Sequence, residues 1–545
     1  MTVRQATTLV MFWALALAGC AQLIIDPAAT NIACTLIIVA GTVPVLLYIR
    51  YSEAMDQQPL STLALLGFCT TTLYGALLAQ SVTGNSVSAS LRQPVTTFTV
   101  LGAYGLVAVG VHAVYRFFTD PTRAPGLIRR SLDRVGIYST PSVPTLWIAG
   151  LIGCISYCFP RPDPTLNGGG PEGGLVSAVA LAFNFLITAP FLIPLYRMLE
   201  GPQYSRSRWV YPGLAAYTML ALVLALVRNA RVIMFVGLAT VGLAYLVTWL
   251  QNRTLIRPGL FVRLGIAAVA FLAVLGPVSN LATAMAIARA ERAKASGAEM
   301  MAATLHVWRK PYLIQQYRDR MGQANRYDRY DESYIANPLF ARLVETKYHD
   351  NALYFAQTLT TRDSQEKLSK ITVKFLWAIL PTPILKRLGI RIDKEDLNFS
   401  MGDYLVYLAR GVPLGGRKIG SLFAQGQVVF GVLFPFVYAL LCVILFKWMD
   451  LLCRRPANGA AAFPVPLALL TVWEFAHLLS PESLHQDGIA IVRGIPTDIA
   501  VYTLVLWIAY VLTGGTATRR QESALPATER SAREPPAGAT AVAVA

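Results

Sequence analysis

Long apolar segments alternate with short polar connections along most of this chain. About twelve of them hold roughly 20 mostly apolar residues, the length a helix needs to cross the ~30 Å hydrocarbon core of a bilayer. They lie near 7–25, 31–49, 60–81, 95–115, 143–160, 174–196, 210–227, 232–250, 259–285, 421–446, 462–482 and 496–514. We therefore expect an all-α, polytopic integral membrane protein with about 12 transmembrane helices.

One large polar segment divides these spans. The expected organisation is helices 1–9 in residues 1–285, a large external loop at 286–420, helices 10–12 in 421–515, and a disordered cytoplasmic tail at 516–545. Residues 161–173 are rich in Gly and Pro and predict a flexible loop. A chain that is 55% hydrophobic and only 14% charged is not a soluble globular protein.

Basic residues fix the orientation of the spans. With the N-terminus inside, the short cytoplasmic segments and the tail carry 20 Lys and Arg, whereas the opposite short loops carry five. The positive-inside rule then puts both termini in the cytoplasm and the long loop outside.

The N-terminus allows a second interpretation. Arg4 and an apolar run ending Leu17-Ala-Gly-Cys20 are also typical of a bacterial lipoprotein signal, but the run continues through Ile25, which favours a first membrane span. The seven cysteines lie almost entirely within or beside apolar segments, so they indicate neither a disulfide framework nor a zinc site. We expect no cofactor.

The external loop is basic beyond what topology requires. It carries 22 Lys and Arg against 14 Asp and Glu. This excess suits an anionic ligand, either a lipid diphosphate or an acidic polymer. The remaining positive charge lies on cytoplasmic segments, where it sets the membrane topology, so it gives no reason to expect nucleic acid. Within the loop, residues 371–384 are apolar but broken at Pro381 and Pro383, which favours a re-entrant or interfacial segment over a span.

Two pairs of arginines are candidates for binding that anion. Arg228 and Arg231 stand three residues apart in a turn at the outer membrane edge, where a positive charge opposes the insertion bias. Guanidinium groups fork onto phosphate oxygens, and the start of the following helix adds amide donors. Arg289 and Arg292 continue the ninth span on one helical face. Arginines that snorkel to lipid headgroups or solvent are the alternative for both pairs.

The eleventh span contains ionisable residues. Glu474 and His477 are three residues apart and hence on one helical face, and a carboxylate at this depth normally faces a cavity or a partner. The spacing permits a metal pair, but no third ligand is evident, so we predict no metal site. A structural Glu–Arg pair is the alternative.

Two further segments of the loop contain candidate residues, one for proton transfer and one for binding an anion. Residues 347–351, Lys-Tyr-His-Asp-Asn, hold His349 and Asp350 as possible general bases, with a solvated pair on an amphipathic helix as the alternative. The Gly-rich segment from Arg410 through Arg417 and Lys418 to Gly420 is a possible anion cradle entering a membrane helix.

Together these features resemble the bacterial O-antigen and exopolysaccharide repeat-unit polymerases (Wzy type), relatives of the O-antigen ligases. The resemblance covers roughly 210–450 and rests on many spans with one large external loop late in the chain. Its motifs are Arg228-Asn-Ala-Arg231 opening a helix, Ile379-Leu-Pro-Thr-Pro-Ile-Leu-Lys386, and Gly415-Gly-Arg-Lys-Ile-Gly-Ser-Leu-Phe-Ala-Gln425 before a span containing Phe430-Gly431.

The resemblance implies a GT-C-like membrane fold and a location in the bacterial inner (cell) membrane. It also implies an inverting, metal-independent glycosyl transfer on the outer face of that membrane. The donor would be a glycan on undecaprenyl diphosphate, and the acceptor a sugar hydroxyl of another lipid-linked unit. A flippase and a chain-length regulator are the expected protein partners. Arginines would stabilise the departing diphosphate, and a base would take the acceptor proton.

Two other functions remain open from the sequence. An O-antigen ligase would share the fold and the leaving group and differ only in its acceptor. A secondary transporter with 12 helices would place its coupling charges near mid-membrane, where Glu474 is the one candidate.

Overall fold

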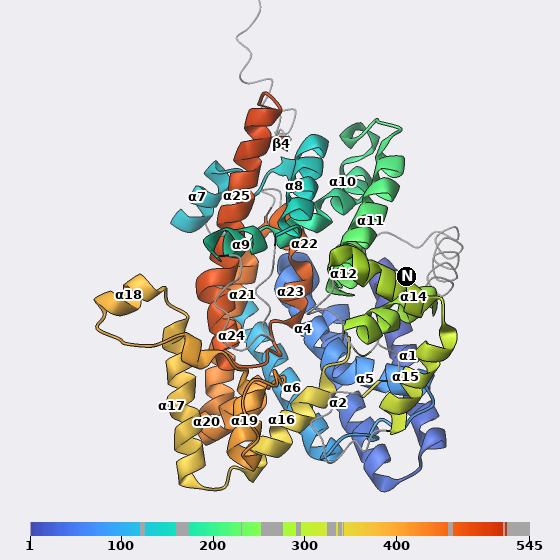
Figure 1. The fold of residues 1–545 in the computed structure, drawn as a ribbon, viewed down its shortest axis with the longest axis vertical. Helices are drawn as coiled ribbons and strands as arrows, with labels where there is room; N and C mark the ends of the chain where they lie inside the picture. Colours follow the sequence, from blue (N-terminus) through green and yellow to red (C-terminus); the bar gives the residue numbers. More distant parts are fainter. Residues whose placement is uncertain are drawn as a thin grey trace, which may run out of the picture.

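The protein is a bundle of helices with almost no strand among its described residues (Figure 1). The computed structural model describes residues 2–119, 126–159, 174–229, 231–251, 276–289, 296–323, 334–335, 341, 343–455, 461–515 and 518–519. The predicted loop at 161–173, most of the ninth span, Arg292 and nearly all of the tail lie outside these ranges.

The first four predicted spans are present as helices. They are α1 (Val3–Ile25), α2 (Ala29–Tyr51), the continuous run α4 (Pro59–Cys69), η1 (Thr70–Tyr74) and α5 (Gly75–Val82), and α6 (Pro94–Phe118), with the short α3 (Ala54–Gln57) between α2 and α4. Thr2 and Gln5 form a capping box at the start of α1. Every residue of α4 is buried, and α4 contacts α2, α6, α21 (Phe434–Leu451) and α23 (Val472–His477), so the core of the bundle lies around it.

The next part of the chain is less regular. It contains α7 (Leu127–Arg134), α8 (Val143–Ser156), α9 (Gly174–Leu181), the 3-10 helix η2 (Asn184–Phe191), α10 (Leu192–Glu200), η3 (Pro202–Tyr204), α11 (Val210–Val227), α12 (Arg231–Gln251) and helical residues 276–288. Helix α8 packs against η2 at very close range, because a Cβ on Gly153 would lie only 2.3 Å from the backbone N of Ile187. Only glycine fits there.

The loop at 286–420 folds into helices that pack onto the bundle. These are α14 (Gly297–Trp308), α15 (Pro311–Gln323), α16 (Thr346–Thr358), α17 (Arg362–Ala378), α18 (Thr382–Arg387), η6 (Glu395–Leu397) and α19 (Met401–Arg410). The C-terminal part has α20 (Leu422–Phe430), η7 (Gly431–Leu433), α21, α22 (Pro466–Leu470), α23, α24 (Leu484–Ile489), the π-helical turn η8 (Ala490–Gly494) and α25 (Ile495–Leu512). In Figure 1, α16, α17, α19 and α20 lie together at the lower left, and α16 and α17 both contact α20.

Two predicted spans differ from the continuous helices that the apolar pattern suggested. The span at 421–446 is broken at Gly431, which has a φ of 54° and separates α20 from α21. The span at 462–482 consists of the short helices α22 and α23, which meet at Thr471. Apolar composition does not reveal such breaks, because the residues on both sides of them are still apolar.

Eight helical segments among the described residues are long and apolar enough to cross a membrane: 3–25, 29–51, 59–82, 94–118, 179–200, 210–227, 422–451 and 484–512. The protein is therefore an all-α, multi-pass membrane protein. Two pairs of very short strands complete the fold, namely β1 (Thr140–Pro141) with β4 (Thr518–Arg519), and β2 (Cys453–Arg454) with β3 (Phe463–Pro464), both antiparallel.

Polar contacts join helix ends that were predicted on the same side of the membrane. At the start of α1, Arg4 forms an ion pair with Asp56, and its Nε donates to the Leu250 carbonyl near the end of α12, 2.6 Å away. The backbone N–H of Ala462 donates to the Asp56 carbonyl, 2.6 Å away. All four residues belong to connections or helix ends assigned to the cytoplasm.

Candidate functional site

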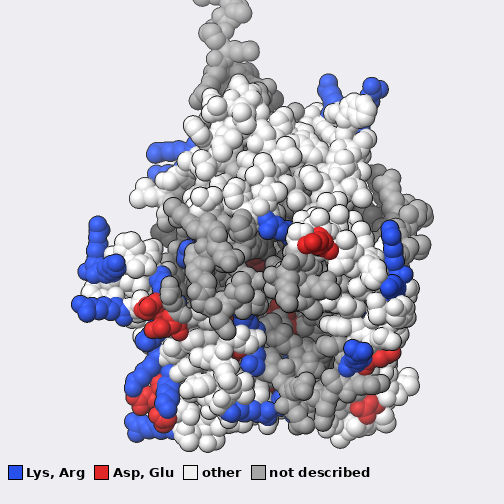
Figure 2. Space-filling model, viewed as in Figure 1, with Lys and Arg blue, Asp and Glu red and all other residues white. Residues whose placement is uncertain are grey.

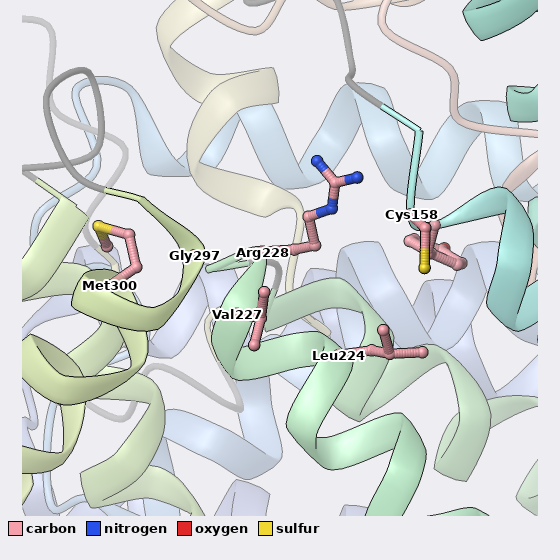
Figure 3. Close-up of a pocket in the computed structure, with 7 residues that line it drawn as sticks. Cys158, Leu224, Val227, Arg228, Gly297 and Met300 are labelled. Atoms are coloured by element: carbon pink, nitrogen blue, oxygen red, sulfur yellow. The ribbon is translucent and has the colours of Figure 1, made fainter.

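Arg228 ends α11 at the edge of a cavity of about 410 Å³, formed where α8, α11 and α14 approach one another. The cavity is lined by Tyr157, Cys158, Leu224, Val227, Arg228, Gly297 and Met300. Figure 3 shows Arg228 between Met300 and Cys158, with its guanidinium pointing away from Leu224. Its Nη2 donates to the carbonyl of Phe159, 2.8 Å away. A cationic side chain thus stands at the edge of a largely apolar cavity.

The turn after Arg228 is fixed by its neighbour. Asn229 is buried with a φ of 45°, a left-handed conformation that asparagine tolerates better than most residues. Its Nδ2 donates to the Met285 carbonyl, 3.0 Å away, which ties the turn to helical residues 276–288. Arg289 lies one turn beyond Met285 and is exposed. Arg231 begins α12, but its side chain is outside what the structure describes.

Asp350 is buried at the point where the loop meets the start of α6. One carboxylate oxygen accepts from the Gln93 N–H and the Thr97 hydroxyl, at 2.9 and 3.0 Å, and the other accepts from the Arg92 N–H at 2.7 Å. The ammonium of Lys347 lies 3.5 Å from that second oxygen. Both oxygens are therefore occupied by groups of the protein, and this geometry favours an anchor for α16 over a general base.

His349, the neighbour of Asp350, is also fully buried. Its Nδ1 forms a hydrogen bond of 2.8 Å with the hydroxyl of Ser421, which caps the start of α20. Its Nε2 has no hydrogen-bond partner among the described residues. Burial lowers the pKa of His349 to about 3, so the ring is neutral at physiological pH. The side chain of His349 links α16 to α20 and is not exposed to an acceptor in water.

The carboxylate of Asp403 binds backbone amides of the Gly-rich segment at 410–420. One oxygen of this carboxylate accepts from the backbone N–H of Arg417 at 2.7 Å, and the other from that of Lys418 at 3.1 Å. Burial opposes ionisation of Asp403, but donation from the backbone of Lys418 and Arg417 outweighs it and lowers its pKa. Two amides that an anion cradle would offer to a ligand therefore bind Asp403. The third predicted cation, Arg410, stacks over the ring of Phe355.

Glu474 lies on α23 and, unlike His349 and Asp350, has an exposed side chain. Asp498 on α25 lies within electrostatic range of it. His477 is on the same short helix, with Nδ1 bonded to the Trp473 carbonyl at 2.7 Å and Nε2 3.7 Å from a carboxylate oxygen of Glu345. The structure thus brings three carboxylates and a histidine from α23, α25 and the segment before α16 into one region, which we call the α23 acidic region.

Sequence reasoning did not single out Glu345 or Asp403. Glu345 directly precedes the 347–351 cluster, and its other oxygen accepts from the hydroxyl of Ser480 at 3.2 Å. Asp403 stands three residues after Ser400, in a capping box that the sequence Ser-Met-Gly-Asp displays. That spacing was the signal available for Asp403, whereas nothing local in the sequence pairs Glu345 with His477.

A metal site has no support among the described residues, where no group of three or more His, Cys, Asp or Glu side chains is arranged to hold an ion. No protein-family model matches this chain, and neither does any curated protein or solved structure. A function for this chain is therefore inferred from its residues and their geometry.

Proposed function

We propose that this chain is a glycosyltransferase that polymerises undecaprenyl-diphosphate-linked oligosaccharide repeat units into a surface polysaccharide at the outer face of the bacterial inner membrane. The observation that carries the proposal is the largely apolar cavity with Arg228 at its edge. A polyprenyl diphosphate joins an apolar chain to two phosphates. Such a cavity offers apolar walls to the polyprenyl chain and a guanidinium to the phosphates.

The proposed transfer is an inverting displacement that needs no metal ion. A hydroxyl oxygen of the acceptor sugar attacks the anomeric carbon of the donor glycan, and the bond from that carbon to the diphosphate oxygen breaks. Undecaprenyl diphosphate leaves with the bonding electrons, so negative charge grows on the diphosphate. Arg228, together with Arg231 and Arg289, is proposed to stabilise this charge, and a carboxylate takes the hydroxyl proton.

Glu474 is the proposed proton acceptor. Its side chain is exposed, whereas Asp350 has four protein donors around its oxygens and His349 is enclosed between α16 and α20. Asp350 and His349 are less suited to this role, because a proton acceptor must come within hydrogen-bond reach of the incoming hydroxyl and protein groups enclose both of them. His477 is proposed to hold α23 against Glu345 and the loop.

The proposal keeps a GT-C-like fold with twelve membrane passages and both termini in the cytoplasm. Eight passages would be the long apolar segments, and α8, α12, residues 276–288 and the pair α22–α23 would supply the other four. Cytoplasmic contacts such as Arg4 with Asp56, and loop-side contacts such as Asp350 with the start of α6, support this arrangement.

The thiol of Cys158, which lines the cavity, can report whether the lipid donor binds there. Of the seven cysteines only Cys20 and Cys158 are exposed, and Cys158 lines the cavity. In a Cys20→Ser background, undecaprenyl diphosphate should slow alkylation of Cys158 by a maleimide, and Arg228→Ala should remove that protection. A Cys158→Ser/Thr360→Cys protein, which carries its thiol on an exposed loop residue, is the control and should label at the same rate with or without lipid.

Two results would count against a diphosphate at this cavity. Equal labelling of Cys158 with and without the lipid would remove the cavity as the donor site. Protection that persists in Arg228→Ala, and that undecaprenol without phosphate gives equally well, would indicate binding of the chain alone.

Proton-coupled transport is the second candidate. The α23 acidic region includes Glu474 and Asp498. Asp487 on α24 is buried, and one of its oxygens has no hydrogen-bond partner in the part of the chain that the structure describes. Intramembrane acids of this kind are typical of proton pathways. Proton uptake into liposomes that depends on Glu474 and on a sugar gradient, without any new glycosidic bond, would favour this candidate.

A further inference from the structure

Helices α17 and α18 form a hairpin that projects from the bundle at the left of Figure 1. Its end carries apolar side chains that no other part of the described chain covers: Trp377, Ile384 and Leu388 are 41%, 45% and 56% exposed. Pro381 separates the two helices, so this is the segment whose sequence predicted an interfacial or re-entrant structure. We call residues 374–391 the hairpin tip.

The hairpin tip lies at the level where the last predicted span begins. Ile379 packs directly on α24, because a Cβ on Gly488 would lie 2.5 Å from its side chain. Lys394, just beyond the tip, has its pKa lowered by burial and by the positive charge of Arg493 in η8. Both α24 and η8 immediately precede α25. The exposed apolar residues Ile489 and Val492 lie on the same stretch, 40% and 52% exposed.

The charge of the tip has one sign. Lys374, Lys386, Arg387 and Arg391 are all exposed, and the sequence has no acidic residue between Glu366 and Asp393. Figure 2 shows Lys and Arg gathered at the end of the projecting hairpin. Exposed apolar side chains flanked by cations are what an interfacial segment presents to a membrane surface.

We propose that the hairpin tip docks on anionic phospholipid headgroups of the leaflet that faces the 286–420 loop. Ile384 and Leu388 enter the boundary between headgroups and acyl chains, and Lys386, Arg387 and Arg391 bind the phosphates around them. The hairpin thereby holds α17 and the rest of the loop at a fixed height above the bilayer. Docking requires no glycan transfer, so its test is independent of the proposed function.

The test uses the full chain in nanodiscs of phosphatidylethanolamine, with or without phosphatidylglycerol. A Leu388→Cys variant in a Cys20→Ser/Cys158→Ser background carries an environment-sensitive dye, and the five remaining cysteines are buried. A matched Thr360→Cys variant places the dye at the other end of α17. Nitroxide lipids should quench the dye at position 388 but not at 360, and phosphatidylglycerol should increase the quenching at 388.

The charges supply a second, independent measurement. Replacing Lys386, Arg387 and Arg391 with glutamine should abolish the effect of phosphatidylglycerol, since each basic residue near an anionic surface changes partitioning by about fivefold. Equal access of iodide to positions 388 and 360 in anionic nanodiscs would overturn the proposal. So would protection of position 388 by a soluble acidic polysaccharide but not by lipid, which would assign the tip to a glycan.

Discussion

At the residue scale, Asp350 shows how burial changes the meaning of a sequence motif. The cluster at 347–351 contains His349 and Asp350, which the sequence left open as general bases or as a solvated pair on an amphipathic helix. In the fold, the Asp350 oxygens accept from the backbone N–H groups of Arg92 and Gln93 and from Thr97, residues more than 250 positions away. Local sequence cannot reveal donors at such a separation.

We predict that Asp350→Ala destabilises the protein by about 3–5 kcal/mol, because it leaves the ammonium of Lys347 and two amides buried without their carboxylate. Thermal unfolding of the purified protein in detergent measures this loss. Asp363→Ala, which breaks an exposed pair with Lys367, is the control and should change the unfolding temperature little. A normally stable but inactive Asp350→Ala protein would return Asp350 to the list of catalytic candidates.

The burial of His349 predicts how the stability of the folded protein depends on pH. Its pKa is about 3 in the folded protein and about 6.5 in an unfolded chain, so below pH 6.5 the unfolded state binds a proton that the folded state does not. Stability from this residue is complete above pH 6.5 and falls as the pH drops toward 3.

Between about pH 6.5 and pH 5, His349 should account for roughly 1–2 kcal/mol of lost stability. His349→Gln should therefore flatten the dependence of the unfolding temperature on pH, whereas His306→Gln at an exposed position should leave it unchanged. An identical pH dependence in wild type and His349→Gln would mean that His349 is not buried in the neutral form.

At the scale of elements, the apolar pattern predicted where helices lie better than it predicted whether they are continuous. The first four spans match their helices, since each is long and apolar throughout. Gly431 interrupts the tenth span because its positive φ turns the chain between α20 and α21. As a result α20 joins the loop helices, and the anchor between His349 and Ser421 forms there.

The Gly-rich segment is a second case: the sequence displays the capping box that contains Asp403, but not the pairing of Asp403 with this segment. Its backbone amides at Arg417 and Lys418 bind Asp403. We predict that Asp403→Ala releases this segment, so that trypsin cuts after Arg410, Arg417 and Lys418 several times faster than in wild type. Asp393→Ala is a control in the same loop that keeps the Asp403 contacts. Unchanged cleavage in Asp403→Ala would show that the segment is held by other contacts.

At the scale of the whole molecule, charge predicts an orientation, and the contacts of Arg4 join helix ends that this prediction puts on one side of the membrane. We expect reporter fusions after residues 140, 205 and 456 to be cytoplasmic and a fusion after residue 330 to be external. Alkaline phosphatase activity and green fluorescence report the two sides. A cytoplasmic signal at 330 would invert every assignment, including the side of the Arg228 cavity and of the hairpin tip.

Composition predicted an all-helical, multi-pass protein, and eight helical segments of the described residues are long and apolar enough to cross a membrane. The meeting of distant groups could not be predicted in this way. Glu345, Glu474 and Asp498 come from three separate regions of the chain, and only the packing of α23 brings them together. The cavity at Arg228 likewise depends on α14, a helix of the 286–420 loop that lies about 70 positions after Arg228 in the sequence.

The central claim is that this protein joins lipid-linked glycans, and the most direct measurement is polymer formation by the purified protein. The assay supplies proteoliposomes with undecaprenyl-diphosphate-linked repeat units as the sole substrate, with a chelator present. The account predicts a ladder of longer glycans and release of undecaprenyl diphosphate. Arg228→Ala and Glu474→Gln should each lower the rate by about a hundredfold or more, whereas Arg362→Ala should not change it. Glycans that stay at one repeat unit in the wild-type reaction, while folded protein binds the donor, would contradict it.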